Sequence, residues 1–296
     1  MAVEYIKTKT ILTRVKQDDR WFRYDYGMNL YRGCSHRCIY CDSRSSCYGI
    51  EDFDRVRAKA DVIGLLHHEL GAKRRPGIIG TGAMSDPYNP LEAKLLLTRQ
   101  ALQAISRHHF GVVVFTKSDL ILRDLDLLRE INRDRPVMAC LTITAAQDEM
   151  SQVIEPGVCV SSRRFKALDE LAKAGIFCGV LMMPLLPFIT DTEENVLGII
   201  KKAKASGARF IYPMFGVTLR ANQRQYYYQQ LDKLFPGLAG KYVAQYGEQY
   251  YCPSPRAREL SALFKRECQT AGLIHELPEI NRLFLDQPGV TQLSFF

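Results

Sequence analysis

Short apolar runs that alternate with longer amphipathic segments constrain the fold of this chain more than any other feature of its sequence. The amphipathic segments repeat their apolar residues at helical spacing, as Ile121, Leu125, Leu128 and Ile131 do. The apolar runs between them have the pattern of buried strands. We predict strands over 27–33, 77–83, 111–115, 136–143, 177–183 and 209–215, and helices over 57–70, 91–107, 120–133, 163–174 and 191–206.

Apolar strands joined by helical crossovers predict a parallel sheet that is buried on both faces. Right-handed crossovers would curl such units into a full or partial barrel. The sequence therefore predicts an α/β fold, a partial (β/α)6 TIM-type barrel of parallel strands with a C-terminal helical extension. Its active site is expected at the carboxyl ends of the strands.

The boundaries of the predicted regions follow from where the alternation of strands and helices begins and ends. A chain of 296 residues with 47% hydrophobic content can bury one large core, which excludes a disordered or fibrous protein. We predict an N-terminal segment over 1–24, a core barrel over 25–220, a C-terminal extension over 221–290 and a terminal tail over 291–296. We find no apolar run long enough for a membrane span and no secretory signal pattern, so we expect a cytoplasmic protein without membrane partners.

Three closely spaced cysteines stand apart from the rest. Cys34, Cys38 and Cys41 have the spacing C-x3-C-x2-C directly after the first predicted strand. Such a loop can wrap three thiolates around one face of a cuboidal iron–sulfur cluster and leave the fourth iron vacant, whereas a ferredoxin ligates every iron. A zinc knuckle with His36 as fourth ligand is the alternative, although His36 lies inside the loop and is poorly placed to complete a tetrahedral site. No second pair exists among the other cysteines: Cys47, Cys140, Cys159, Cys178, Cys252 and Cys268.

With the aromatic Tyr40 immediately before the third cysteine, this motif resembles the signature of the radical S-adenosylmethionine (SAM) superfamily. The resemblance implies a 4Fe-4S cluster held by Cys34, Cys38 and Cys41, with SAM bound at the open iron. It also implies a one-electron reductant of the flavodoxin or ferredoxin type. Reduction would cleave SAM to methionine and a 5′-deoxyadenosyl radical, which abstracts a hydrogen atom from the substrate.

Further motifs resemble the spore photoproduct lyase-like (DNA repair photolyase-like) group of this superfamily. They follow one another at residues 80–92, at 115–118 and at Glu155-Pro156 with Arg164, and the resemblance covers roughly residues 25–275. In that group the segment ending the second strand approaches the amino group of SAM. The resemblance therefore implies cofactor contacts from Gly82, Ser85 and Asp86.

Three charged residues are also implied in the cofactor site. Lys117 follows the third predicted strand, where its ammonium would pair with the carboxylate of SAM; a solvated loop lysine is the alternative. Glu155 and Arg164 either form a mutual ion pair that organises the cofactor pocket or contact the ribose or carboxylate directly.

Two positions depart from the group's pattern. A spore photoproduct lyase returns a hydrogen atom from a cysteine in the second-strand segment, where this chain has Ala83. Asp42 replaces the tyrosine that normally follows the third cluster cysteine. The resemblance therefore supports the shared cofactor chemistry without implying repair of spore photoproduct itself. Cys140 and Cys178 lie inside apolar runs, so we expect them to be buried rather than to act as hydrogen donors.

Charge and composition bear on the partners. A net charge of +8 favours a polyanionic partner, or reflects scattered solubilising residues. Interleaved tyrosines and basic residues after the core suit base stacking and phosphate contact, with core packing of the tyrosines as the alternative. They are Tyr226, Tyr227, Tyr228, Tyr246, Tyr250 and Tyr251, together with Arg220, Arg224, Lys241, Arg256 and Arg258.

The tail from Gln292 to Phe296 resembles the short peptide by which bacterial DNA enzymes dock on the replication sliding clamp. Phe295 departs from the usual leucine of that peptide. Insertion of its two phenylalanines into a groove would suit such docking, and packing of the tail on its own domain is the alternative.

We therefore expect a radical SAM enzyme of the lyase class that acts on nucleic acid. Its expected reaction is the repair or modification of a DNA lesion. A damaged base would have to leave the stack to reach a buried radical. The same chemistry on RNA, a peptide or a small molecule is one alternative. A non-catalytic, metal-stabilised nucleic-acid-binding protein is the other.

Overall fold

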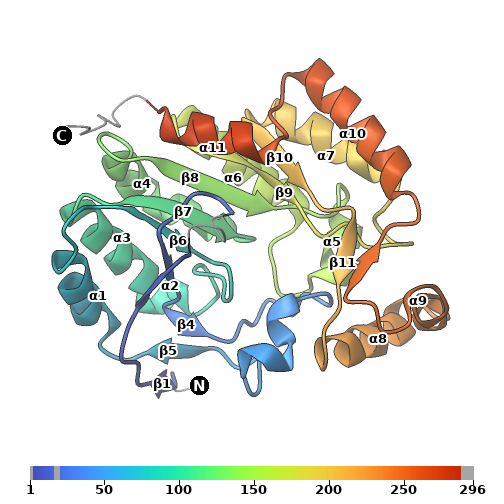
Figure 1. Cartoon of the computed structure of the whole chain (residues 1–296), viewed down its shortest axis with the longest axis horizontal. Coiled ribbons are helices and arrows are strands. Elements are labelled where there is room, and N and C mark those ends of the chain that lie inside the picture. The colour runs from blue at the N-terminus through green and yellow to red at the C-terminus, as the bar shows by residue number, and fades with distance from the viewer. Residues whose placement is uncertain (1–2, 17–20, 288–296) are drawn as a thin grey trace.

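A computed structural model describes residues 3–16 and 21–287 of the chain. Its centre is a seven-stranded sheet in the order β10-β9-β8-β7-β6-β3-β2 (Figure 1). All neighbours pair in parallel except β2, which pairs antiparallel with β3 at one edge. The bounds are β2 (Leu12–Arg14), β3 (Tyr26–Met28), β6 (Ile78–Thr81), β7 (Gly111–Thr116), β8 (Val137–Thr142), β9 (Phe177–Met182) and β10 (Phe210–Pro213). The predicted α/β partial barrel of parallel strands is confirmed.

The central strands are apolar along their whole length because both of their faces are buried. In β7, Val112 and Val114 belong to the core between the sheet and the helices, whereas Val113 and Phe115 belong to the core inside the barrel. Alternation of side chains along a strand produces this division. The outer layer contains α1 (Val62–Gly71), α3 (Leu97–Arg107), α4 (Leu125–Ile131), α6 (Ser161–Lys173) and α7 (Glu193–Ala205) (Figure 1).

Segments from both ends of the described chain fill the barrel interior. Phe22, which precedes β3, is fully buried, and its ring lies 5.5 Å from that of Phe115 and 6.4 Å from that of Phe210. The helix α11 (Leu277–Leu285) contributes Ile280 and Phe284 to the same core. The residues just before the first strand of the core therefore pack inside the barrel.

The first predicted βα unit is more irregular than the periodicity indicated. The segment predicted as one strand over 27–33 divides into β3 of the main sheet and β4 (Tyr31–Arg32), which pairs in a separate sheet with β5 (Arg57–Lys59) and, through β5, with β1 (Tyr5–Ile6). The predicted helix over 57–70 was wrong at its start, because those residues form β5 and α1 begins after Asp61, whose φ is +51°.

Two further predicted helices are interrupted. The one over 91–107 divides at Leu96, whose φ of +54° ends α2 (Glu92–Leu95) before α3 begins. A 3-10 turn over Asp119–Asp124 replaces the first part of the one over 120–133. Apolar spacing does not reveal such breaks, because the apolar face continues across them.

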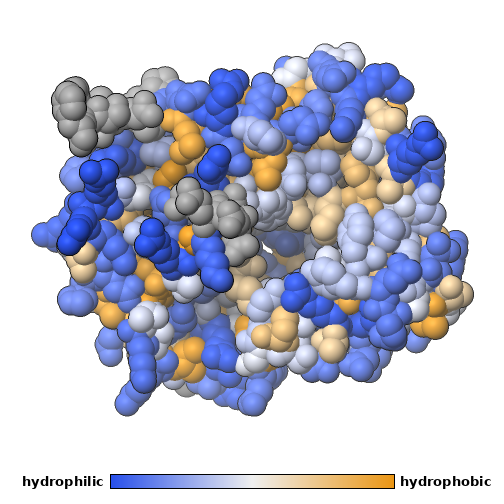
Figure 2. Space-filling view, viewed as in Figure 1, coloured by the Kyte–Doolittle hydropathy of each residue, from blue (hydrophilic) through white to orange (hydrophobic). Residues whose placement is uncertain are grey.

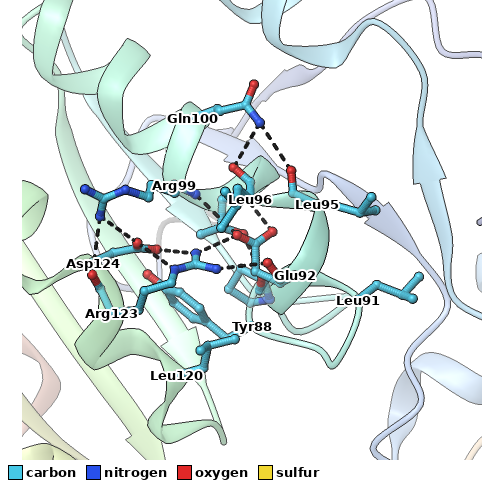
Figure 3. Close-up of polar contacts among 12 residues, drawn as sticks. Tyr88, Leu91, Glu92, Leu95, Leu96, Arg99, Gln100, Leu120, Arg123 and Asp124 are labelled. Carbon is cyan, nitrogen blue, oxygen red and sulfur yellow. Dashed lines mark hydrogen bonds and ion pairs between the residues drawn. The ribbon is translucent and has the colours of Figure 1, made fainter.

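A buried charged network holds α2 in place (Figure 3). The Glu92 carboxylate is fully buried and accepts hydrogen bonds from the Thr98 backbone N–H at 2.9 Å and from the Arg123 guanidinium at 2.6 Å. It also accepts a hydrogen bond from the hydroxyl of Tyr31, in β4. Asp124, also fully buried, contacts Arg99 at 3.0 Å. The network ties the segment after β6 to the strand that leads into the three-cysteine loop.

The C-terminal part adds three helices and a small antiparallel pair of strands beside the barrel. The pair consists of β11 (Gly216–Thr218) and β12 (Tyr251–Pro253), and α8 (Gln223–Leu234) and α9 (Leu238–Tyr246) lie between them in sequence. The helix α10 (Ala257–Ala271) packs against α7. The predicted C-terminal helical extension is confirmed.

Hydrophilic residues cover most of the face shown in Figure 2, with hydrophobic residues scattered among them. Within the described ranges, no helix has the length and apolar character needed to cross a membrane.

Candidate active site

A cavity of about 390 Å³ lies at the carboxyl ends of the parallel strands. Residues at the end of, or just after, five successive strands line it: Gly82 and Ala83 after β6, Lys117 after β7, Thr142 in β8, Met183 and Pro184 after β9, and Met214 after β10. Cys41 and its neighbours Asp42 and Ser43 form another part of the wall. This position is the one expected for the active site of a barrel of parallel strands.

The three-cysteine loop is held from both sides by backbone hydrogen bonds. The N–H of Cys34 donates to the Phe53 carbonyl at 2.8 Å, and the N–H of Ile39 donates to the Ile154 carbonyl, in α5 (Asp148–Ile154), at 3.0 Å. Gly33 enters the loop with a φ of +81°, and a Cβ there would lie 2.7 Å from the Phe53 carbonyl oxygen. The loop conformation therefore requires glycine at this position.

The three thiols are free and share one environment. Cys34 and Cys38 are buried, and Cys41 is partly exposed where it lines the cavity. Burial raises the pKa of Cys34 to about 12 and raises those of Cys38 and Cys41, while the charge of Lys117 opposes the rise at the last two. Thiols with raised pKa values release protons when they bind a metal.

The donor chemistry of the three-cysteine loop fits an iron–sulfur cluster. A four-iron cube distributes its thiolate ligands over separate irons, and three cysteines of one loop supply three such ligands. Within residues 3–16 and 21–287, no group of three His, Cys, Asp or Glu side chains is found that could hold a single metal ion.

Glu155 and Arg164 form a mutual ion pair. Both side chains are fully buried, and Arg164 Nη2 lies 2.5 Å from Glu155 Oε2. The guanidinium also donates to the carbonyls of Cys159, at 2.8 Å, and Thr142, at 2.9 Å. Glu155 accepts a hydrogen bond from the hydroxyl of Tyr40. The pair thus connects the three-cysteine loop to the end of β8.

Opposing influences act on the ionisation of this group. Burial alone would raise the pKa of Glu155, but Arg164, Lys117 and the Tyr40 hydroxyl together hold it below its ordinary value. Burial alone would lower the pKa of Lys117, but Cys38 and Glu155 raise it above its ordinary value. Glu155 is therefore a carboxylate and Lys117 an ammonium, whose nitrogen lies 5.8 Å from the centre of the Tyr40 ring.

Ser85 and Asp86 lie outside the cavity lining and hold neighbouring segments. The Ser85 hydroxyl donates to the Gly33 carbonyl at 2.5 Å. The Asp86 carboxylate accepts from the Thr116 hydroxyl at 2.7 Å and from the Lys117 N–H at 2.8 Å, and it lies 3.5 Å from His36 Nδ1. These contacts fix the three-cysteine loop and the end of β7 relative to each other.

Gly82 allows the cavity wall to approach β7 closely. Its φ is +101°, and a Cβ there would lie 1.9 Å from the Phe115 carbonyl oxygen. We predict that Gly82→Ala lowers the free energy of unfolding by roughly 3 kcal/mol, through backbone strain and overpacking. Denaturant unfolding measures this loss.

Gly64→Ala is the matched control. Gly64 lies inside α1, and a Cβ there would have nothing within 4 Å of it, so alanine should raise the free energy of unfolding by about 0.5–1 kcal/mol. Equal effects of the two substitutions would contradict the close approach at Gly82.

The structure brings together most of the residues that the sequence indicated and adds others. Cys41, Gly82 and Lys117 line the cavity, and Glu155, Arg164 and Asp86 lie behind its wall. Met183 also lines the cavity, whereas Met182 is fully buried. Cys140 and Cys178 are fully buried, as predicted.

Sequence reasoning missed the cavity residues at the two ends of the core. Trp21 and Tyr24 come from the predicted N-terminal segment, Met214 follows β10, and Val217 and Thr218 lie in β11. Only the aromatic character of WFRY before the first strand could have signalled the first two.

Solved structures share this fold. A spore photoproduct lyase complexed with dinucleoside spore photoproduct has a TM-score of 0.66 with 14% identity over 92% of this chain and 81% of its own. The radical SAM methyltransferase TsrM from Kitasatospora setae, with tryptophan substrate and a SAM analogue bound, has a TM-score of 0.54 with 13% identity over 81% of this chain and 51% of its own. These likenesses concern the fold.

Sequence comparison identifies the family. The uncharacterized protein Rv2578c of Mycobacterium tuberculosis is 30% identical over 80% of this chain and 71% of its own length. The uncharacterized protein MJ0683 of Methanocaldococcus jannaschii is 31% identical over 57% of this chain and 63% of its own length. Residues 28–200 match the family model of the radical SAM superfamily. The chain therefore belongs to the radical SAM superfamily, whose cofactors are SAM and a 4Fe-4S cluster.

Proposed function

We propose that this protein is a radical SAM enzyme that acts on nucleic acid and that its substrate is a damaged DNA base. Cys34, Cys38 and Cys41 are its proposed cluster ligands. The bound cofactors supply one-electron cleavage of SAM to methionine and a 5′-deoxyadenosyl radical, which takes a hydrogen atom from the substrate. The cavity supports this proposal, because Cys41 and Lys117 face it together at the ends of the strands.

The other residues have distinct proposed roles around SAM. Gly82 lets the cofactor approach the backbone, and the Lys117 ammonium pairs with its carboxylate. Ser85 and Asp86 act as positioning residues, since their polar atoms already bind the three-cysteine loop and β7. The Glu155–Arg164 pair holds that loop against β8 without itself lining the cavity.

One arginine and two tyrosines beside Asp42 of the cavity wall favour nucleic acid as the substrate class. We call them the basic–aromatic rim, which consists of Tyr48, Arg220 and Tyr250. The Arg220 guanidinium lies 4.7 Å from the centre of the Tyr250 ring and 5.8 Å from that of Tyr48.

Asp42 joins this rim to the cavity. It lines the cavity, lies 3.4 Å from Arg220 Nε and accepts a hydrogen bond from the Tyr48 hydroxyl at 2.8 Å. Tyr250 is 49% exposed, so its ring is accessible. Guanidinium groups and exposed rings suit the phosphates and bases of a single strand, from which one nucleotide would enter the cavity.

Several of the remaining tyrosines are buried. Tyr227, Tyr242 and Tyr246 are buried in the core of the C-terminal part, and Tyr227 and Tyr242 share a hydrogen bond of 2.9 Å. Core packing therefore accounts for them. Arg256 is engaged by Glu193 and Glu259, so we exclude it from the rim.

We predict that Arg220→Gln weakens binding of single-stranded DNA and reduces the salt dependence of its affinity by about one unit of slope, because one phosphate contact is lost. Fluorescence anisotropy of a labelled oligonucleotide over a range of salt concentrations measures both effects. Arg107→Gln is the control, because it removes the same charge at the end of α3, before β7 begins. Equal effects of the two substitutions would contradict a specific rim.

Release of 5′-deoxyadenosine tests the substrate class. The proposal predicts stimulation by irradiated DNA and not by undamaged DNA, RNA or peptide. If only RNA, a peptide or a small molecule stimulates the release, that compound class and not DNA is the substrate. Failure to release 5′-deoxyadenosine with any of them, in a protein that still binds DNA, would favour a non-catalytic nucleic-acid-binding protein.

Spore photoproduct itself is not assigned as the substrate. A related fold binds the dinucleoside spore photoproduct, but this cavity has Ala83 on its wall, and Cys41 is the only cysteine among the described residues that line it. Lyase activity therefore stays a proposal, as does a flavodoxin- or ferredoxin-type reductant. The tail from Gln292 to Phe296 lies outside the described residues, and sliding-clamp binding stays a sequence prediction.

A further inference from the structure

Some of the residues that line the cavity lie outside residues 28–200, the range that matches the superfamily model. Five lining residues lie outside residues 28–200: Trp21 and Tyr24 before the match, and Met214, Val217 and Thr218 after it. The lining residues inside the match include Cys41, Gly82 and Lys117, which serve cofactors that all members share. Residues outside the match can differ between members, so they are the part of the wall that suits substrate selection.

The residues before the match form an aromatic floor together with Phe115. We use this term for Trp21, Tyr24 and Phe115, which all line the cavity. Phe115 precedes Lys117 by two residues, so it lies about 7 Å deeper along the strand direction.

The rings of the floor are held in fixed orientations. Trp21 and Phe115 are nearly parallel, with an interplanar angle of 16° and 6.2 Å between ring centres. Tyr24 lies against β6, because a Cβ on Gly80 would be 2.6 Å from its ring. The Trp21 carbonyl accepts a hydrogen bond of 3.2 Å from Asn281, in α11.

Trp21 nevertheless keeps part of its surface open. Its side chain is only partly buried, in contrast to the adjacent Phe22, which is fully buried in the barrel. Among the described residues, no hydrogen-bond partner is found for the indole N–H of Trp21. A rigid, partly open aromatic surface that lines a cavity is suited to stacking with a planar ring. A cavity of about 390 Å³ has no room for a duplex.

We propose that Trp21 is the stacking platform for the substrate's planar ring. Given the proposed function, this ring is the extruded nucleobase. The base stacks on the floor with its sugar–phosphate directed toward the rim, while SAM occupies the wall formed by Cys41, Gly82 and Lys117. Stacking recognises the flat face of a base and requires no particular sequence around it.

The sequence contains one tryptophan, so its fluorescence reports directly on the floor. The reconstituted holoenzyme is saturated with S-adenosylhomocysteine, which cannot be cleaved to a radical, and then titrated with a thymine dinucleotide. We expect saturable quenching of the Trp21 emission by the dinucleotide. Quenching by S-adenosylhomocysteine with no further change on adding the dinucleotide would assign the ring to the cofactor and overturn the proposal.

Variants test the same claim by affinity. Trp21→Ala should weaken binding of a fluorophore-labelled single-stranded DNA about 5- to 100-fold, as expected for loss of one base–aromatic stack, and Trp21→Phe should weaken it less. Tyr5→Ala, which removes a 56% exposed ring outside the cavity, is the control. Iron content and the unfolding midpoint establish that each variant is folded and loaded.

The outcomes separate this proposal from the proposed function. Wild-type binding that Trp21→Ala leaves unchanged overturns the stacking platform alone. A wild-type holoenzyme that binds no nucleic acid overturns the nucleic-acid function and the platform with it.

Discussion

Replacement of Cys34, Cys38 or Cys41 by alanine, one at a time, is expected to abolish reductive cleavage of SAM. Loss of residues that merely support a metal ligand lowers metal affinity or activity 10- to 100-fold, so loss of a ligand should exceed about 100-fold. The three thiols share one loop whose Cys41 lines the cavity, and no cysteine outside that loop lines it among the described residues, so no substitute ligand is at hand. Iron and sulfide content and 5′-deoxyadenosine release measure the loss.

Cys47→Ser is the matched control for these variants. Cys47 lies six residues after Cys41 and is exposed. The substitution should leave cluster content and SAM cleavage at the level of the unmodified protein. Full iron content together with normal 5′-deoxyadenosine release in any of the three alanine variants would show that the cysteine concerned is not a ligand.

Removal of the Glu155 carboxylate is expected to destabilise the protein by about 3–5 kcal/mol. Glu155→Ala leaves the fully buried Arg164 without its partner and the Tyr40 hydroxyl without its acceptor. An uncompensated buried charge costs far more than the loss of an ion pair in water. Denaturant unfolding of the variant and of the unmodified protein, prepared in the same state of cluster loading, measures the difference.

A double-mutant cycle assigns this loss to the pair. Arg164→Met alone should also destabilise, and the double variant should cost less than the sum of the two single variants by more than about 1 kcal/mol, in the lower part of the range for residues in contact. Lys173→Ala is the control, because it breaks an exposed ion pair with Asp169 and should cause no measurable change. Additive effects of Glu155→Ala and Arg164→Met would contradict an energetically coupled pair.

The barrel could be predicted because its strands are apolar on both faces. Val112 to Phe115 read as a continuous apolar run, and alternate residues of that run face the helices and the barrel interior. The breaks could not be predicted. Asp61 and Leu96 have φ values of +51° and +54° where the helices begin or end. Near Leu96, the Glu92 carboxylate contacts Tyr31 and Arg123, which are distant in sequence, and local apolar spacing does not encode such contacts.

Short sequence motifs predicted the site residues that lie close together in the sequence or that follow adjacent strands. The three cysteines share one loop, and Gly82 and Lys117 follow adjacent strands, so all of them could be located from patterns. Trp21 reaches the cavity only because the N-terminal segment enters the barrel, and Thr218 does so only because β11 pairs with β12 beside the three-cysteine loop. These placements depend on contacts between distant parts of the chain.

The central claim is that three thiolates hold an iron cube and leave one iron open to SAM. Anaerobic reconstitution, counting of iron and sulfide, and measurement of 5′-deoxyadenosine after chemical reduction with SAM test it most directly. We expect about four irons and four sulfides per chain, as a cubane requires, with 5′-deoxyadenosine release that depends on the reductant. A colourless protein that binds zinc without sulfide, or an iron-loaded protein that releases no 5′-deoxyadenosine, would contradict it.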